Sequence, residues 1–432
     1  MNVFKLIISV LLFIELSNCT LSPPKDRNSK KSKGKIEIKK GPVGQDVFSR
    51  ILVVKNPKAH DIIRESGFYF SNTTRRRFTG EVLGYITPWN NNGIEVSKIF
   101  HGKFTMVSPV WLAFPEGNAS TYKLSTHDVQ KKWLKEMKAT NNENHHVKIL
   151  PRVLFEHWSV NDIVGLYSDT HKQTTLISAL VDTAKNFHFD GYVLEIWNQF
   201  VLTGVDTQIV VALIQFIAHQ LKNNNLDTIL AVPPSRGPNV QLFNKDQFDQ
   251  LSPYLKAFSL MTYDYSSIQR PGPNSPLDWA RECVELLVPE KGPKRAQILL
   301  GLNLYGYNYT PEGGGAILGL DYLKILESFK GKIQWDDNSK EHFFESKSSG
   351  SSGIIFYPTL YSILHRLDLA AELGTVFRIL PSFATIKVAR GQYMYYEKLL
   401  EIIDLQSIRL CYFSSGRKLR DSSESLNYVH AM

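Results

Sequence analysis

The chain has 432 residues, of which 43% are hydrophobic and 21% are charged, a composition typical of a globular protein with a large core. Three cysteines, Cys19, Cys283 and Cys411, are too few for a disulfide framework, so the core must hold the fold. The formal net charge is +9, but residues 24–40 contain eight Lys or Arg and two acids and carry six of these charges. No zinc-finger, homeodomain or RNA-recognition pattern accompanies this basic stretch, which excludes the common classes of nucleic-acid-binding protein.

The N-terminus has the pattern of a secretory signal peptide. Lys5 precedes an apolar stretch from Leu6 to Ile14, and small and polar residues follow. We expect a signal peptide over residues 1–19 and a basic linker with an N-terminal extension over residues 20–80. The basic stretch is either a solvated linker or a patch for anionic glycans or lipids. No later stretch reaches the roughly 18 apolar residues of a transmembrane helix, so we expect a soluble, luminal or extracellular protein with no transmembrane segment.

Three sequons agree with passage through the secretory pathway. They begin at Asn72, Asn118 and Asn308, each followed two residues later by Ser or Thr. Each is a candidate glycosylation site on a surface loop.

From Glu81 onward, almost continuously apolar runs alternate with helical patterns. Such runs are typical of parallel strands buried on both faces, and we expect strands at residues 82–89, 104–114, 147–156, 189–197, 228–234, 258–265, 298–307 and 375–380. Expected helices between them include residues 176–185, 207–224, 279–288 and 359–373. The alternation predicts an α/β fold, a (β/α)8 TIM barrel over residues 81–380 with a small β insertion at residues 335–358 before the last helix. Residues 381–432 form a divergent tail.

Aromatic and acidic side chains gather where the expected strands end, which is where barrels of this kind place their sites. Aromatic faces stack on sugar rings and carboxylates accept hydrogen bonds from hydroxyl groups, although single aromatics at such places are equally often core filler. As a set they predict a carbohydrate groove. Its candidate residues are Tyr85, Trp89, Trp111, Glu156, Trp158, Glu195, Trp197, Met261, Tyr263, Asp264 and Tyr305.

Three motifs resemble the chitinase-type glycoside hydrolase family 18. They are FDGYVLEIW at residues 189–197, SLMTYDYS at 259–266 and LLGLNLYGY at 299–307. The family's fourth strand reads D-G-x-D-x-D-x-E, and its final Glu is the general acid. Asp190 and Gly191 match this pattern, whereas Val193, Glu195 and Trp197 stand at the three later positions. The resemblance therefore implies the family fold without its catalytic residue, because an indole N–H is not an acid in this pH range.

Side chains alternate along a strand, so we expect Val193, Glu195 and Trp197 on one face, with Trp197 at the sugar site. Glu195 would then lie about 7 Å deeper than the missing acid. Two interpretations stay open for it: a buried carboxyl satisfied by Tyr263 or Asp264, or, like Glu156, a relocated general acid. The resemblance also implies that Tyr263 and Asp264 hold the N-acetyl group of the sugar and that Asp190 orders the start of the strand.

The resemblance implies a catalytically inactive, chitinase-like lectin that is secreted or lysosomal. Its ligands would be chito-oligosaccharides and lipopolysaccharide, in innate immune recognition, with a stabilin-type scavenger receptor as partner. The alternatives are an active glycosidase with a relocated acid and a protein-interaction scaffold without a sugar ligand. No cofactor or metal site is expected, since the histidines lack ligand spacing on a helix. The family's eighth strand ends in a Trp that this chain lacks after Gly374.

Overall fold

The structure is a computed structural model that describes residues 41–74, 80–88, 91–115, 122–141, 145–237, 242–310, 314–348 and 351–380. The expectations for the signal peptide, for Trp89 and Asn118, and for residues 381–432 lie outside the described residues.

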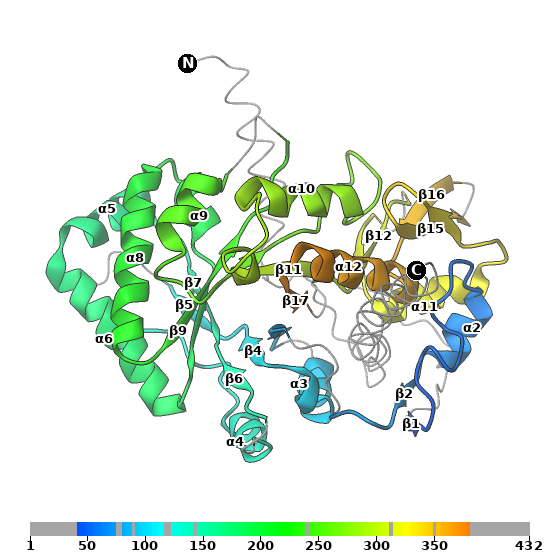
Figure 1. Ribbon diagram of the computed structural model, residues 1–432, viewed down its shortest axis with the longest axis horizontal. Helices are drawn as coiled ribbons and strands as arrows, with labels where there is room; N and C mark the ends of the chain where they lie inside the picture. The colour runs from blue at the N-terminus through cyan, green and yellow to red at the C-terminus, as the bar shows by residue number, and fades with distance from the viewer. Residues whose placement is uncertain are drawn as a thin grey trace, which may run out of the picture.

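A parallel sheet of ten strand segments forms the centre of the molecule (Figure 1). Its spatial order is β5 (Leu112–Phe114), β7 (Arg152–Phe155), β8 (Gly191–Leu194), β9 (Asp227–Val232), β10 (Ala257–Leu260), β11 (Ile298–Asn303), β17 (Val376–Leu380), β3 (Val82–Ile86), β4 (Met106–Pro109) and β6 (Lys148–Ile149). Two residues separate β4 from β5 and two separate β6 from β7, so each pair lies on one run of chain. Every strand expected from the apolar runs is present, mostly with earlier ends.

Apolar side chains on the two faces of this sheet belong to two separate clusters. The outer cluster joins the sheet to the helices; it contains Val82 and Leu194 of the strands and Leu180 and Ile214 of the helices. The inner cluster lies on the opposite face and consists of Leu83, Tyr85, Met106, Val110, Leu150, Val193, Ile229, Ala257, Met261, Tyr263, Leu299, Tyr305 and Leu318. Strands that bury both faces need apolar residues at every position, which explains the continuous runs in the sequence.

Helices follow most strands and cover the outer face. They are α3 (Asn91–Ile99), α4 (Lys131–Ala139), α5 (Val160–Ser168), α6 (Thr170–Phe187), α7 (Trp197–Leu202), α8 (Thr207–Asn223), α9 (Lys245–Leu251), α10 (Leu277–Leu287) and α12 (Leu360–Leu373), with short 3-10 turns at His101–Lys103 and Arg295–Gln297. Local sequence sets their ends: Ser159 caps α5, Asp169 caps α6 and Asp206 caps α8. Thr359 caps α12, which ends at Gly374 in the left-handed region.

The insertion before α12 is larger than the sequence predicts. It is a five-stranded antiparallel sheet in the order β13 (Gly315–Ile317), β12 (Gly306–Asn308), β16 (Ser351–Phe356), β15 (Glu341–Ser348) and β14 (Gln334–Asp336), with helix α11 (Gly319–Ser328). The insertion begins soon after β11, with β12. At Gly306, the first residue of β12, the backbone passes close to β16. A Cβ at Gly306 would lie 2.1 Å from the carbonyl oxygen of Phe356, so only glycine fits there.

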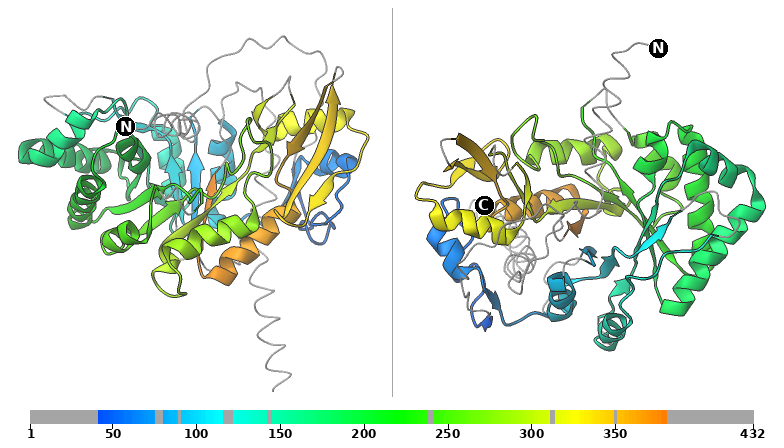
Figure 2. Two further views of the ribbon diagram at one scale, coloured as in Figure 1. Left: turned by 90° about the horizontal axis from the view of Figure 1, so that it is seen from above. Right: turned by 180° about the vertical axis from the view of Figure 1, so that it is seen from behind.

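Residues 41–70, which lie within the expected N-terminal extension, are folded. Strand β1 (Gly41–Val43) pairs in parallel with β2 (Phe68–Phe70), and helix α2 (Ala59–Glu65) lies between them. Ala59, Ile62 and Ile63 pack against the apolar cluster of the insertion, and α2 lies beside α11 in Figures 1 and 2. Strand β1 thus begins at the residue that follows the basic stretch 24–40 in the sequence.

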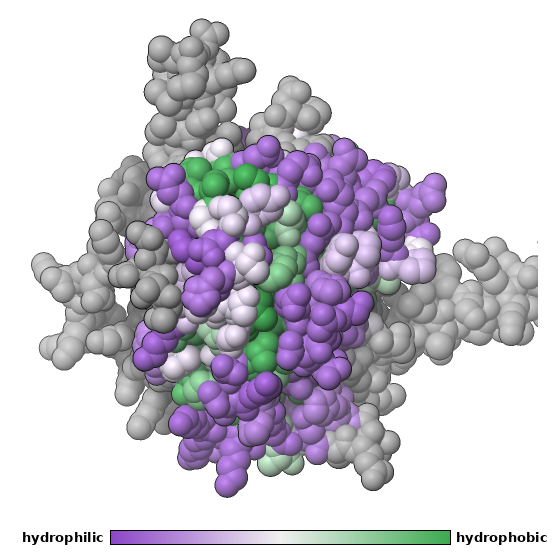
Figure 3. Space-filling model, turned by 90° about the vertical axis from the view of Figure 1, so that its left-hand side faces the viewer, coloured by the Kyte–Doolittle hydropathy of each residue, from purple (hydrophilic) through white to green (hydrophobic). Residues whose placement is uncertain are grey.

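The face covered by α5, α6 and α8 is largely hydrophilic, with apolar residues in a band across its middle and in patches at the top and the lower left (Figure 3). Polar outer faces of this kind are expected for helices whose apolar sides pack on a sheet. None of the helices in the described part of the chain is long and apolar enough to span a bilayer.

Candidate functional site

The Asp-Gly pair at the start of β8 has a structural role. The carboxylate of Asp190 accepts a hydrogen bond of 2.7 Å from the backbone N–H of Ile149, which ties β8 to β6. Gly191 has a φ of +151°, and a Cβ there would lie 2.0 Å from the carbonyl oxygen of Asp227 on β9. Asp190 therefore orders the start of β8, as expected, and Gly191 allows the backbones of β8 and β9 to approach closely.

The expectation that Trp197 shares a face with Val193 and Glu195 differs from the structure. The strand ends at Leu194 and Trp197 begins helix α7, so alternation no longer applies to it. Its side chain is fully buried in the outer cluster, and its indole N–H donates to the carbonyl oxygen of Leu242 at 2.8 Å. Its ring also packs edge-on against Phe243, with centroids 4.8 Å apart. The side chain of Trp197 is therefore part of the core and is not on the inner face of the sheet.

Glu195 is paired with a residue that sequence reasoning missed. Its Oε2 accepts from Nη1 of Arg152 on β7 at 3.0 Å, and the side chains are only 10% and 6% exposed, respectively. The expected partners were Tyr263 and Asp264. The motif gives no sign of Arg152, which lies 43 residues earlier in the chain and meets Glu195 only because β7 pairs with β8.

Asp264 forms the polar centre of the inner face. It follows β10 with a φ of +58°, and its Oδ1 accepts from the hydroxyl groups of Tyr305 and Tyr307, the latter at 2.9 Å. Its backbone N–H donates to Oδ1 of Asn274 at 2.7 Å. Two phenols on one carboxylate oxygen fix its orientation, and Tyr307 is a further residue that the sequence analysis did not name.

Burial and the neighbouring Asp264 carboxylate both keep Tyr305 protonated. Burial is the larger cause that raises the pKa of Tyr305 well above its ordinary value, and the charge of Asp264 raises it further. The phenol is therefore a hydrogen-bond donor throughout the physiological pH range. Because both phenols donate their protons to Asp264, the arrangement holds an oriented carboxylate, which is an acceptor suited to the hydroxyl or amide groups of a ligand.

Three further predicted residues lie in the same inner cluster as Tyr305. Tyr85, Met261 and Tyr263 all belong to it, and the ring of Tyr263 meets that of Tyr305 edge-on, with centroids 6.3 Å apart. The hydroxyl of Tyr85 lies 3.1 Å from Oγ of Ser259 on β10. The structure therefore brings together Tyr85, Met261, Tyr263, Asp264 and Tyr305, whereas Glu195 lies one residue beyond the end of β8 and is held by Arg152.

Other predicted residues lie elsewhere. Trp111 and Trp158 are buried in the outer cluster, where Trp111 packs edge-on against Trp133 and Trp158 stacks on Tyr122. Glu156 is half-buried in the turn after β7. Large aromatic side chains at strand ends can face either side of a sheet, and here two tryptophans supply core packing.

A buried ion pair from the insertion holds the loop that carries Asn274. Glu341 on β15 accepts from the backbone N–H groups of Asn274 and Ser275, at 3.0 and 2.6 Å. Nη2 of Arg366 on α12 donates to Glu341 at 2.8 Å. The insertion thus positions Asp264 through Asn274, a connection between residues about 70 positions apart that no local motif signals.

Neither a metal site nor a reactive thiol is found in the part of the chain that the structure describes. No group of three or more His, Cys, Asp or Glu side chains there is arranged to hold a metal ion. Cys283 is a free, buried thiol, and burial raises its pKa to about 12.

Comparison with known proteins places this geometry in a family. Residues 81–377 match the model of the glycosyl hydrolases family 18. Similar solved structures include the spore cortex-lytic enzyme SleL of Bacillus cereus, with 14% identity and a TM-score of 0.59 over 77% of this chain and 75% of that chain. A chitinase from Chromobacterium violaceum has 15% identity and a TM-score of 0.59, over 76% of this chain and 99% of that chain. The chitinase of Cycas revoluta in complex with (GlcNAc)3 has 14% identity, the same TM-score and the same coverage.

At these identities the structural similarity concerns the fold, which is TIM-barrel-like in this family. The family model matches more than half of the chain and includes the strand with Asp190 and Gly191, as well as Asp264 and Tyr305. This chain therefore belongs to glycosyl hydrolase family 18.

Proposed function

We propose that this protein is a chitinase-like lectin that binds oligosaccharides of the N-acetylglucosamine type without hydrolysing them. The observation that carries the proposal is Trp197, which stands at the position of the family's general acid and is buried with its indole N–H bonded to Leu242. A retained binding element accompanies the lost proton donor, because Asp264 accepts from Tyr305 and Tyr307 on the inner face.

The proposed groove rests on a closed (β/α)8 barrel. Its support is the pairing pattern: if β4 and β5 count as one strand and β6 and β7 as another, eight parallel strands remain. Each of these eight then has two neighbours, since β17 pairs with both β11 and β3 and β7 pairs with both β5 and β8. In such a barrel Tyr85, Tyr263, Asp264 and Tyr305 lie at the carboxyl ends of the strands, where ligands bind.

Calorimetric titration with chitotetraose tests binding. Asp264→Asn and Tyr305→Phe each alter a hydrogen bond to a charged group, which is worth about 1.5–3 kcal/mol, so we expect affinity to fall about 10- to 100-fold. Tyr167→Phe is the matched control, because Tyr167 is 45% exposed on α5, outside the inner cluster. Chitotetraose that gives no heat, or binds both site variants as well as the control, would overturn the proposal and favour a scaffold without a sugar ligand.

A hydrolase with a relocated acid is the second candidate, and Glu156 is the residue that keeps it open. Glu156 is half-buried after β7, whereas Glu195 already serves as an acceptor for Arg152. A general acid must donate a proton, so Glu195 is poorly arranged for that task. Turnover of labelled chito-oligosaccharide that disappears in Glu156→Gln would establish the hydrolase, and absence of turnover in the unmodified protein would support the lectin.

The biological setting is part of the proposal. We assign the chain to the chitinase domain-containing branch of the family, with secretion or lysosomal delivery by a stabilin-type receptor and recognition of microbial glycans, including lipopolysaccharide. Among the described sequons, Asn72 is exposed, whereas Asn308 is half-buried and its Oδ1 accepts from the backbone N–H of Thr310. Glycosylation is therefore expected at Asn72 first. A glycan array with the secreted protein and its mass before and after glycosidase treatment test these points.

A further inference from the structure

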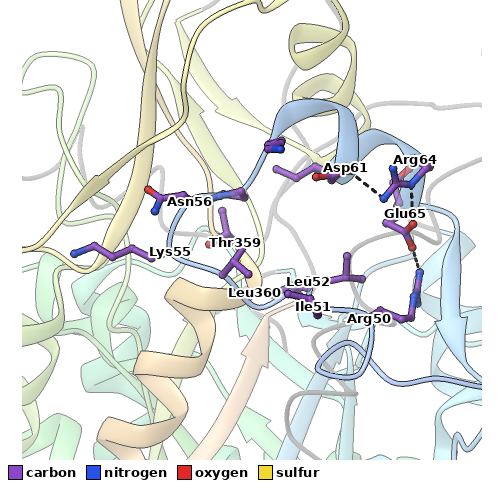
Figure 4. Close-up of a pocket in the computed structure, with 15 residues that line it drawn as sticks. Arg50, Ile51, Leu52, Lys55, Asn56, Asp61, Arg64, Glu65, Thr359 and Leu360 are labelled. Carbon is purple, nitrogen blue, oxygen red and sulfur yellow. Dashed lines mark hydrogen bonds and ion pairs between the residues drawn. The ribbon is translucent and has the colours of Figure 1, made fainter.

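A cavity lies away from the inner face of the parallel sheet (Figure 4). It has a volume of about 370 Å³ and is enclosed by residues 50–66 and the start of α12. Pockets for small molecules begin at about 300 Å³, so this one suits a small ligand. None of its lining residues belongs to the inner cluster; they are Arg50, Ile51, Leu52, Val54, Lys55, Asn56, Pro57, Lys58, Asp61, Ile62, Arg64, Glu65, Ser66, Thr359 and Leu360.

The lining is apolar along its walls and charged at its ends. Arg50, Arg64 and Glu65 gather at one end, and Lys55 and Asn56 lie at the other (Figure 4). Four basic and two acidic side chains line the cavity, a formal excess of two positive charges. This excess favours an anion over a cation.

Pairing outside the lining removes part of this excess, because Nζ of Lys55 pairs with Asp337 at 3.0 Å, which leaves an excess of one positive charge. Both acids of the lining are already engaged by arginines: Glu65 by Arg50 and Arg64, and Asp61 by Arg64 at 3.0 Å. Lys58 forms no ion pair with any residue that the structure describes.

Arg50 has one nitrogen that needs an acceptor. Its Nη2 meets Glu65, but its Nη1 is buried without a hydrogen-bond partner among the described residues. The guanidinium carbon lies 5.9 Å above the ring of Phe68, which limits how far the group can turn towards solvent. Buried polar nitrogens are nearly always paired, so an oxygen acceptor supplied by a ligand would complete this group.

Ile51 adds an apolar edge in an unusual conformation. It has a φ of +53°, a region that disfavours a β-branched residue, and the residue is 76% exposed. The turn is closed by bonds from Ile51 N–H to Phe48 and from Leu52 N–H to Val47, both 2.9 Å. Glycine is the usual residue at this point of such a turn. An exposed isoleucine at this position beside a cavity is explained if a ligand covers the Ile51 side chain.

We propose that this cavity binds a small amphipathic monocarboxylate. Its carboxylate would accept from Nη1 of Arg50, with Lys58 adding positive charge at the rim. Its apolar body, aliphatic or aromatic, would lie along Leu52 and Leu360 and cover Ile51. The cavity is thus a second ligand site that shares no residue with the proposed oligosaccharide groove.

Calorimetric titration of the full chain with butanoate, hexanoate and octanoate tests the site. We expect saturable binding of one molecule that tightens about fourfold for each methylene, the usual gain for burying that group. Phenylbutyrate separates an aromatic from an aliphatic body, and octylamine tests the sign of the charge. The proposal is overturned if octanoate gives no saturable heat or if octylamine binds equally well.

Two variants locate the binding within the cavity. Arg50→Gln should weaken octanoate about 10- to 100-fold through loss of a charged hydrogen bond. Ile51→Gly should weaken octanoate while raising the unfolding temperature, since glycine accepts the positive φ, so this readout does not depend on damage to the fold. Ile268→Gly is the matched control, because Ile268 is 55% exposed outside the cavity. Octanoate binding unchanged in both site variants would refute the assignment, as would competition between octanoate and chitotetraose.

Discussion

Breaking the buried Arg152–Glu195 pair gives the sharpest test of how the inner face is held. At an effective dielectric constant of about 20, the Coulomb attraction across the 3.0 Å contact is about 5 kcal/mol, and desolvation of the two ions offsets much of it. Nε of Arg152 has no hydrogen-bond partner among the described residues, which adds to the cost of burial. Arg152→Met or Glu195→Met alone leaves the other charge buried and unpaired, so we expect each to lower the free energy of unfolding by about 3 kcal/mol or more.

The double variant Arg152→Met with Glu195→Met separates pairing from packing. It removes both charges and fills the space with apolar groups, so it should cost less than either single change, with a coupling of at least about 3 kcal/mol. Urea unfolding followed by tryptophan fluorescence at pH 7 measures all four proteins. If the double variant costs the sum of the single ones, the two side chains do not act as a pair and the reasoning fails.

Three further predictions concern the strand start, the insertion and the acid position. Gly191→Ala should cost about 3 kcal/mol or more in urea unfolding, since its Cβ would meet Asp227, whereas Gly204→Ala, with a φ of +90° and no atom within 4 Å, should cost only about 1–2 kcal/mol; equal costs would refute the steric account. Burial lowers the pKa of His342 to about 4 from 6.5, so the unfolded chain binds the extra proton first and stability is lost as the pH falls below about 6.5. Between pH 7 and pH 5 this amounts to about 2 kcal/mol, and His342→Gln should flatten the profile of unfolding free energy against pH; an unchanged profile would contradict the assignment. Trp197→Glu should lose several kcal/mol of stability and gain no chitinase activity, because its side chain packs in the outer cluster; measurable turnover would contradict this placement.

The strand positions are the part of the fold that local sequence predicts best. Apolar runs mark strands that are buried on both faces, and the runs around Val82, Leu194 and Leu299 all form strands of the parallel sheet. Helices α6 and α8 also follow from local sequence, since Asp169 and Asp206 are short polar residues that cap their N-termini. The extent of the insertion is harder to predict from the sequence, because its strands are short and pair antiparallel with distant segments, as β12 does with β16.

The candidate site could be predicted only in part. Asp264 and Tyr305 were identified from motifs next to their strands, and they do meet on the inner face. Trp197 shows the limit of the same reasoning: alternation holds only while the backbone is extended, and the strand ends three residues earlier, at Leu194. Whether an aromatic residue at a strand end faces a ligand or the helices depends on the backbone beyond that end, which the local pattern does not specify.

Sequence by itself determined the alternating α/β architecture and the lack of a carboxylate at position 197, because each depends on residue type and local spacing. Tertiary structure alone decided which side chains Glu195 and Glu341 contact. Arg152 reaches Glu195 across 43 residues and Glu341 reaches Asn274 across 67, through strand pairing and packing of the insertion. Such contacts depend on how distant segments are brought together, and a linear pattern carries no information on which buried charge will meet which.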